Sequence, residues 1–230
     1  MRQLAFLFLP LVGVGFAASG ATAQGNWYFE GDAGALKPFD SSGSETFING
    51  AHTITSPGVI TTTYTVGPAI DLGLGYRFTP HFRVEGEFGY AHDTQASVSP
   101  LSTNGALPEL NGERLDLQSG GGRNLYSGMV NAFYDLPISG RIIPYVGGGV
   151  GFSEFVGQTA QFAGPGDFPR FTQPGGSAFR VAIAGETGLT LALDRNWSLA
   201  PSYRFEHLVG VDNRSVGNAN LFRLGLRRSF

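Results

Sequence analysis

The sequence predicts an all-β fold: an eight-stranded antiparallel up-and-down transmembrane β-barrel whose charged lumen is filled by side chains. Three observations predict it. From Trp27 onward, apolar residues recur with a period of two, the period of a strand with one apolar and one polar face. The segments between the predicted strands alternate between short turns and long polar stretches. Charged residues make up only 14% of the chain, where about a quarter is typical of soluble proteins.

The first residues are predicted to be removed before the chain folds. Met1-Arg2 gives a short basic start, Leu4 to Phe16 an apolar core, and Ala21-Thr22-Ala23 an A-x-A cleavage site. The apolar core is too short for a spanning helix. We therefore expect a signal peptide at 1–23 and one mature domain at 24–230. The chain has no cysteine, so no disulfide holds the exported fold.

Eight segments carry the strand alternation. It is clearest from Trp197 to Glu206, where Trp197, Tyr203 and Phe205 share one face and Arg204 and Glu206 share the other. The predicted strands are 26–36, 66–78, 82–92, 124–136, 142–153, 178–193, 197–207 and 218–230.

The connections between these strands differ in length at the two ends of the barrel. Those at 79–81, 137–141 and 194–196 are short and rich in turn formers. Those at 37–65, 93–123 and 154–177 are predicted to be long polar loops, the second of them mobile, and 208–217 is a shorter one. Tight turns at one end and long loops at the other describe the periplasmic and external ends of an outer-membrane barrel. An even number of strands places both termini at the periplasmic end.

The distribution of charge indicates which strand face points outward. The apolar face carries one charge, Arg228, and has aromatic residues near the strand ends, as the interfacial girdles of lipid-facing barrels do. The polar face is therefore expected to line the lumen as a structural charge network, in which arginines pair with carboxylates because an unpaired buried charge costs several kcal/mol. The girdle residues are Trp27, Tyr76, Phe78, Phe82, Tyr134 and Trp197. The network residues are Glu30, Asp32, Asp71, Arg77, Arg83, Glu85, Glu87, Asp135, Arg180, Glu186, Arg204, Glu206, Arg223 and Arg227.

No catalytic or metal-binding motif stands out. The glycines at 147, 149 and 151 step by two along a strand, which favours lumen packing over a phosphate-binding loop. Glu85 and Glu87 share a face, as a hydrolytic carboxylate pair would, but Arg83 on the same face favours ion pairing. The four histidines lack metal-ligand spacing, and no G-x-S-x-G occurs.

Apolar residues in the long loops leave two readings open. They either pack on the barrel rim or contact a surface partner, and packing is favoured. These residues are Phe47, Phe155, Phe162, Phe168 and Phe171.

Several segments resemble the outer-membrane β-barrel domain family, which includes OmpA-like and opacity-type surface proteins. They are Tyr126–Leu136, Pro144–Gly151, Trp27–Phe29, Asn196–Leu199 and Leu224–Phe230. The resemblance implies that Phe230, preceded by apolar residues at two-residue steps, is the assembly signal read by the barrel-assembly machinery. Arg228 departs from the aromatic residue that members often carry at that place. The resemblance does not extend to the lipid-facing His-x-Ser pair of barrel deacylases, and omptin proteases are longer.

The expected function is that of a surface or structural protein of the Gram-negative outer membrane, which displays long external loops and is not an enzyme. Alternatives are a narrow passive pore, a lipid-modifying barrel enzyme and a soluble lipocalin-like binder. The charged lumen argues against the lipocalin-like binder. Neither cofactor nor metal is expected. Expected partners are outer-membrane lipid and lipopolysaccharide, the assembly machinery and, as an open possibility, a surface partner for the loops. A net charge of −3 with a single lysine, Lys37, argues against nucleic acid.

Overall fold

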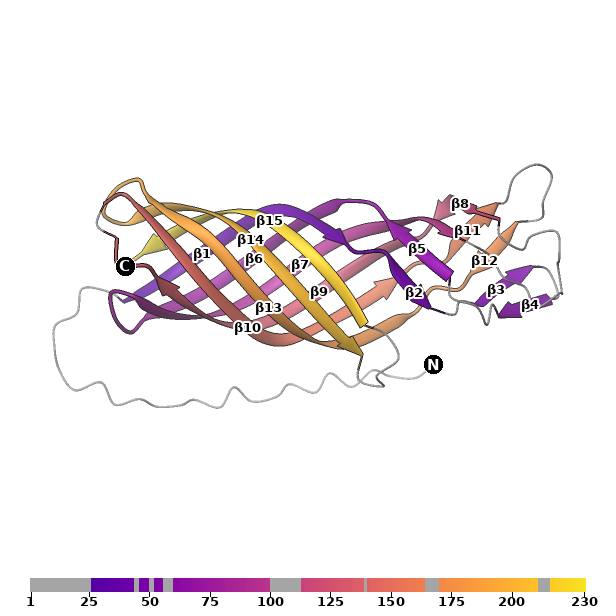
Figure 1. Ribbon diagram of the computed structural model, residues 1–230, viewed down its shortest axis with the longest axis horizontal. Helices are drawn as coiled ribbons and strands as arrows, with labels where there is room; N and C mark the ends of the chain where they lie inside the picture. Colours follow the sequence, from indigo (N-terminus) through magenta and orange to yellow (C-terminus); the bar gives the residue numbers. More distant parts are fainter. Residues whose placement is uncertain are drawn as a thin grey trace.

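The computed structural model describes residues 26–43, 46–49, 52–55, 60–99, 113–138, 140–163, 170–210 and 216–230 (Figure 1). The predicted signal peptide at 1–23 lies outside the described residues and stays a prediction. Among the residues that are described, there is no helix long and apolar enough to cross a membrane.

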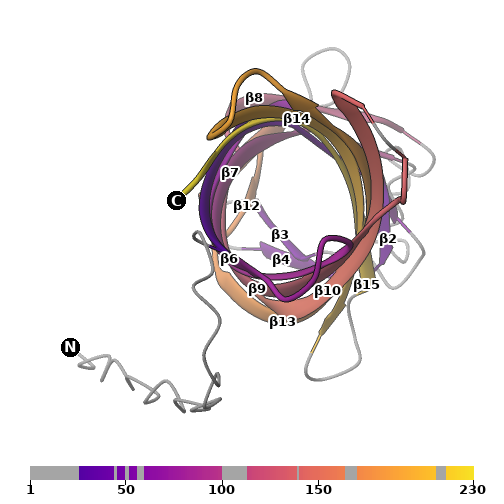
Figure 2. The ribbon, with the colours of Figure 1, turned by 90° about the vertical axis from the view of Figure 1, so that its left-hand side faces the viewer.

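Eight long strands form a closed antiparallel barrel, as the sequence predicts (Figure 2). Each strand pairs with the next one along the barrel, and the last pairs with the first, where Glu30 lies opposite Arg227. Relative to the predicted spans, three strands run three or more residues further at their external ends, to Ser99, Gly157 and Gly210. In order around the barrel the strands are β1 (Trp27–Pro38), β6 (Gly67–Arg77), β7 (Phe82–Ser99), β9 (Gly122–Asp135), β10 (Ile142–Gly157), β13 (Ser177–Ala192), β14 (Trp197–Gly210) and β15 (Val216–Ser229).

The short turns gather at one end of the barrel, together with the start of β1 and the C-terminus (Figure 1). In the turn between β13 and β14, the Leu193 N–H donates to the Trp197 carbonyl at 3.0 Å. The Asp194 carboxylate accepts the backbone N–H groups of Asn196 at 2.7 Å and Trp197 at 2.8 Å. These two bonds hold the pKa of this exposed carboxyl below its ordinary value.

The wall of the barrel alternates strictly between its two faces. On β6, Ile70, Leu72 and Leu74 are each more than half exposed, whereas Asp71 between them is 5% exposed. Outward side chains are apolar because they contact lipid, and inward ones pack within the lumen. The assignment of the apolar face to the outside is therefore confirmed along this strand.

Aromatic and polar outward residues mark two boundaries of the apolar band. At the turn end, the rings of Trp27, Tyr76 and Phe78 contact one another at centroid distances of 5.0 and 4.9 Å. At the other end, His92 on β7 lies opposite Asn124 on β9. Ten residues separate Phe82 from His92, which at about 3.3 Å per residue and a tilt of about 40° span about 25 Å. The strand residues beyond His92 therefore stand outside the membrane.

An external sheet extends one side of the barrel beyond this boundary (Figure 1). The prediction that 37–65, 93–123 and 154–177 are loops is wrong where these segments form the strands of this external sheet. The sequence signal was missed because these strands are rich in threonine and serine and carry no lipid-facing apolar row. The strands are β2 (Ser41–Gly43), β3 (Thr46–Asn49), β4 (His52–Thr55), β5 (Ile60–Tyr64), β8 (Leu115–Gly120), β11 (Ala160–Ala163) and β12 (Phe171–Gln173), in the spatial order β2-β5-β7-β8-β11-β12-β3-β4.

The external sheet has a small core of its own. Val98, Leu115, Phe162 and Phe171 are fully buried in it. The two phenylalanines thus pack within the sheet and are not exposed contact residues. Phe155 is partly buried against the lumen. Phe168 and the side chain of Phe47 lie outside what the structure describes.

Candidate functional site in the barrel lumen

Arg204 on β14 lies at the centre of the lumen and is 1% exposed. It bonds the Glu87 carboxylate of β7 with both terminal nitrogens, the Nη2–Oε2 distance being 2.7 Å. Its Nε donates to Glu186 Oε2 on β13 at 2.9 Å. Because β7 and β14 are four strands apart in an eight-stranded ring, the Arg204–Glu87 pair spans the lumen.

Arg223 on β15 bonds the same two carboxylates. Its Nη1 donates to Glu87 Oε2 at 2.9 Å, and its Nη2 donates to Glu186 Oε2 at 2.5 Å. Asp71 on β6 approaches Nη1 at 3.3 Å. Two arginines and two glutamates therefore alternate in one cluster that joins four strands. Such charge-assisted bonds satisfy groups whose burial alone would be costly.

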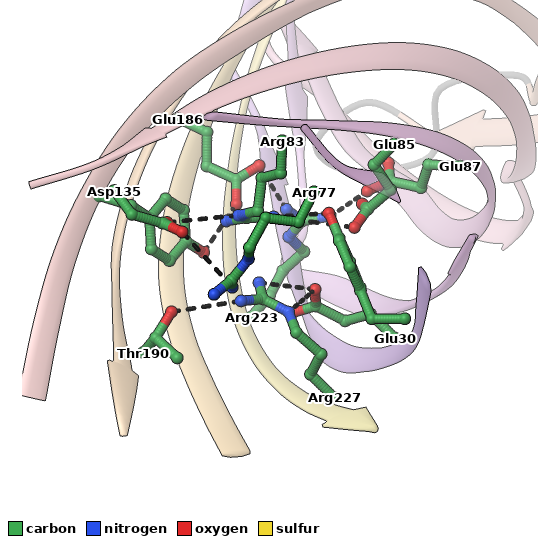
Figure 3. Close-up of polar contacts among 12 residues, drawn as sticks. Glu30, Arg77, Arg83, Glu85, Glu87, Asp135, Glu186, Thr190, Arg223 and Arg227 are labelled. Atoms are coloured by element: carbon green, nitrogen blue, oxygen red, sulfur yellow. Dashed lines mark hydrogen bonds and ion pairs between the residues drawn. The ribbon is translucent and has the colours of Figure 1, made fainter. Parts of the chain in front are cut away.

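A second cluster lies toward the turn end (Figure 3). Arg227 Nε donates to Glu30 Oε2 at 2.7 Å, and its Nη1 donates to Thr190 at 3.2 Å. Arg83 bonds Asp135 at 3.3 Å and the Tyr28 hydroxyl at 3.0 Å.

Aromatic rings surround the Arg83 guanidinium. The guanidinium carbon lies 3.9 Å from the Phe133 ring centre and 4.7 Å from that of Tyr145. Cation–π contacts of this kind add to the ion pair in a desolvated site. At this level aromatic rings as well as charges therefore line the lumen.

Twelve of the fourteen residues proposed from the sequence for the lumen are buried; the exceptions are Arg77 and Arg180. Arg77 has a 37% exposed side chain and reaches Asp135 at 3.5 Å from the turn end. Arg180 lies near the external end, where its guanidinium stacks on Phe155 at 4.8 Å. Asp32 and Asp71 lie opposite each other on β1 and β6. Among the described residues, no group of three or more histidines or carboxylates is arranged to hold a metal.

The lumen also contains an apolar layer, on the external side of the charges, that was not predicted from the sequence. It has two parts, and Phe155 packs against both. A sequence signal for it exists, since pairs such as Leu125-Tyr126, Leu208-Val209 and Leu221-Phe222 place apolar side chains on both faces of a strand. The first part contains Leu36, Ala69, Ala91, Leu125, Ala219 and Leu221, and the second contains Met129, Ala182, Ala184 and Leu208.

Glycine makes room for the packed charges. A Cβ at Gly225 on β15 would lie 2.6 Å from carboxylate oxygens of both Asp32 and Glu30. Any side chain at this position would displace two buried carboxylates. The lumen is thus filled to the point where only hydrogen fits at Gly225.

The family of the chain follows from its sequence together with this architecture. The model of the outer membrane protein β-barrel domain matches residues 4–230. The chain belongs to this family. It is accordingly a protein of the cell outer membrane, with the short turns in the periplasm and the external sheet at the cell surface. No curated protein matches the chain by sequence.

Solved structures of other outer-membrane barrels share the fold. OprG of Pseudomonas aeruginosa is 15% identical, with a TM-score of 0.52 over 90% of this chain and 96% of its own. Neisserial surface protein A is 17% identical, with a TM-score of 0.49 over 89% of this chain and 97% of its own. The outer membrane protease OmpT of Escherichia coli is 8% identical, with a TM-score of 0.43 over 88% of this chain and 97% of its own. At these identities the similarity concerns the fold alone.

The external mouth of this outer-membrane barrel carries one further ion pair. Arg123 on β9 bonds both carboxylate oxygens of Asp93 on β7 at 2.7 Å. Its guanidinium carbon lies 3.7 Å from the centre of the Tyr64 ring on β5. The pair therefore ties the barrel wall to the external sheet.

Proposed function

We propose that this outer-membrane barrel is a non-conducting, non-enzymatic structural protein that holds an ordered sheet at the cell surface. The observation that carries the proposal is the Arg204–Glu87 pair, which spans the lumen between opposite walls. Most of the buried charges are paired, which leaves few groups to solvate a passing ion, and the layer beyond them is largely apolar.

The external sheet supports a role at the surface. Its fully buried side chains, Phe162 among them, give it a small core, so its outer face is an ordered display surface. Partners proposed for the protein are outer-membrane lipid and lipopolysaccharide around the wall and a surface partner for the sheet. Phe230 is proposed as the signal for the barrel-assembly machinery. Its exposed ring at the periplasmic seam, where its N–H donates to the Trp27 carbonyl at 3.1 Å, supports this.

Deleting the gene from its native host tests the structural role against the pore alternative. We expect the deletion to raise sensitivity to detergents that the outer membrane normally excludes, without slowing the uptake of small solutes. The wild-type gene should restore resistance. A deletion that slows solute uptake and leaves detergent sensitivity unchanged supports the narrow pore and contradicts the proposal.

A further inference from the structure

Four polar side chains form a patch on the lipid-facing wall, at the external boundary of the membrane. Lys37 on β1 lies opposite Asn220 on β15, and His207 on β14 lies opposite Asn218. All four belong to the outward-pointing set of their strands. His207 is ten residues from Trp197 of the periplasmic girdle, the same separation as between Phe82 and His92. The patch therefore sits at the level of the lipid headgroups of the outer leaflet. We call these four residues the headgroup patch.

Internal hydrogen bonds orient the patch so that it offers donors. The Tyr203 hydroxyl donates to Asn220 Oδ1 at 2.6 Å. His207 Nδ1 lies 2.8 Å from Asn218 Oδ1 and must carry the hydrogen, because that oxygen can only accept. Both amide carbonyl groups are thus occupied, and the amide nitrogens are left to donate.

Lys37 adds a positive charge to these donors. Its Nζ donates one hydrogen to the Tyr64 carbonyl at 2.5 Å, which leaves two for a ligand. An ammonium, an imidazole and two amides spread over three strands, about 10 Å across at the usual strand spacing, suit a phosphorylated sugar.

A groove begins directly on the membrane side of the headgroup patch. Its volume is about 570 Å³, and it lies on the outer wall over β13, β14, β15 and β1. Ala33 and Ala35 form a shallow stretch, flanked by Phe222 and Leu224. Tyr203 lines the groove and also bonds Asn220, so the groove and the patch are continuous. This shallow apolar hollow spans two outward residue levels, from Ala35 and Phe222 to Ala33 and Leu224, and fits part of an acyl chain.

We propose that this face binds one lipid A moiety of lipopolysaccharide, with a phosphate on the headgroup patch and an acyl chain in the groove. The site deepens the lipopolysaccharide contact proposed above and rests on it, but it does not depend on whether the lumen conducts. The phosphate group satisfies the free donors, and the chain fills the groove with the apolar surface that lipid contact requires.

The opposite wall provides a matched comparison. There, Asn124 Oδ1 accepts from His92 Nδ1 at 2.9 Å and from the Tyr90 hydroxyl at 3.0 Å. No lysine lies on these strands, and the exposed Glu154 is on the outward face of the adjacent β10, opposite Tyr126. Both walls carry a histidine–asparagine pair. Where the first wall adds the positive charge of Lys37, the opposite wall adds the negative charge of Glu154. This pair is therefore expected to bind a lipid phosphate poorly.

Native mass spectrometry on the full-length folded protein in detergent tests the proposal. The probes are bisphosphorylated lipid A, the same lipid after dephosphorylation, and phosphatidylglycerol. We expect wild type to retain one bisphosphorylated lipid A in preference to the other two. Lys37→Ala and Asn218→Ala should each weaken retention about tenfold, the effect of losing one charge-assisted hydrogen bond. Ala35→Phe, which fills the groove, should weaken it as well.

His92→Ala is the matched control and should retain lipid A as wild type does. Heat-modifiable migration on gels establishes that every variant is folded. Equal retention of the dephosphorylated lipid or of phosphatidylglycerol would overturn the proposal. So would loss of retention in His92→Ala equal to that in Lys37→Ala, or a protein dimer in place of the lipid adduct.

Discussion

At the scale of single residues, the barrel depends on buried arginines that each serve several carboxylates. Arg204 contacts Glu87, Glu186 and Glu206, and its side chain is 1% exposed. Arginine suits this position better than lysine because its planar fork bonds several acceptors at fixed angles. The stability of the lumen therefore rests on a few guanidinium groups.

Removing one of these groups should be costly. Arg204→Ala leaves three buried carboxylates short of a partner, and we expect it to lower the free energy of unfolding by about 3–5 kcal/mol. Arg114→Ala is the control, since it breaks an ion pair with Asp116 in which both side chains are more than 60% exposed. It should cost less than about 1 kcal/mol. Urea unfolding of both variants in liposomes measures the difference, and similar costs would contradict the buried network.

The lipid face can be tested at one position in the same way. Leu72 is 57% exposed and lies midway along its strand between Phe78 and Val66. Leu72→Arg should cost about 2–4 kcal/mol, because arginine at the bilayer midplane is poorly solvated. Val66→Arg, at the external end of the same face, should cost about 0–1 kcal/mol. The reverse ranking in liposome unfolding would mean that the two faces are assigned wrongly.

At the scale of elements, the barrel strands and the external sheet differ in how they are stabilised. Barrel strands have partners on both sides and lipid outside. The external sheet has open edges at β2 and β4 among the described strands, and it holds together through a small core and the Arg123 contacts. Such an element opens locally more easily than the barrel.

The link between the two elements predicts a selective effect of Arg123→Ala. Losing its bonds to Asp93 and the stack on Tyr64 should lower the local stability of the sheet by about 1.5 kcal/mol. The rate of proteolytic cleavage of the external segments should therefore rise about tenfold. Barrel unfolding in urea should change little. Ser119→Ala, which removes one exposed hydrogen bond to Gln161, serves as the control. Equal cleavage of the two variants in intact vesicles would show that Arg123 does not hold the sheet.

The turn at Asp194 predicts a pH dependence. Its lowered pKa means that its contribution to stability is complete above the ordinary aspartate value of 3.8 and is lost as pH falls through the lowered one. A carboxyl titration followed by NMR should show a midpoint for Asp194 below the ordinary aspartate value of 3.8, which serves as the reference. A midpoint at or above the reference would exclude the two backbone hydrogen bonds in the folded protein.

Some elements of this fold could be predicted from the sequence and others could not. The eight barrel strands could be predicted because lipid demands an apolar side chain at every second outward position, as at Ile70, Leu72 and Leu74. Strands such as β5, with three consecutive threonines, lie outside the lipid and lack this signal. Which carboxylate meets which arginine could not be predicted either. Glu87 and Arg204 are 117 residues apart, and only the stagger of the closed barrel brings them together.

At the scale of the whole molecule, the protein is a barrel with a lumen packed by side chains and a sheet on one rim. From the periplasmic side, Arg83 lies among aromatic rings, the Arg204 and Arg223 cluster follows, and the apolar layer around Leu125 lies toward the external end. An ion would have to break paired charges and then cross apolar side chains. We therefore infer that the lumen is closed to ions.

Conductance across planar lipid bilayers tests this claim most directly. Wild-type protein, refolded and inserted, should give no steady single-channel current. Arg204→Ala should introduce a leak, because it removes the side chain that bridges opposite walls, whereas Arg114→Ala on the external sheet should remain silent. A steady wild-type current that Arg204→Ala leaves unchanged would mean that the lumen is an open channel.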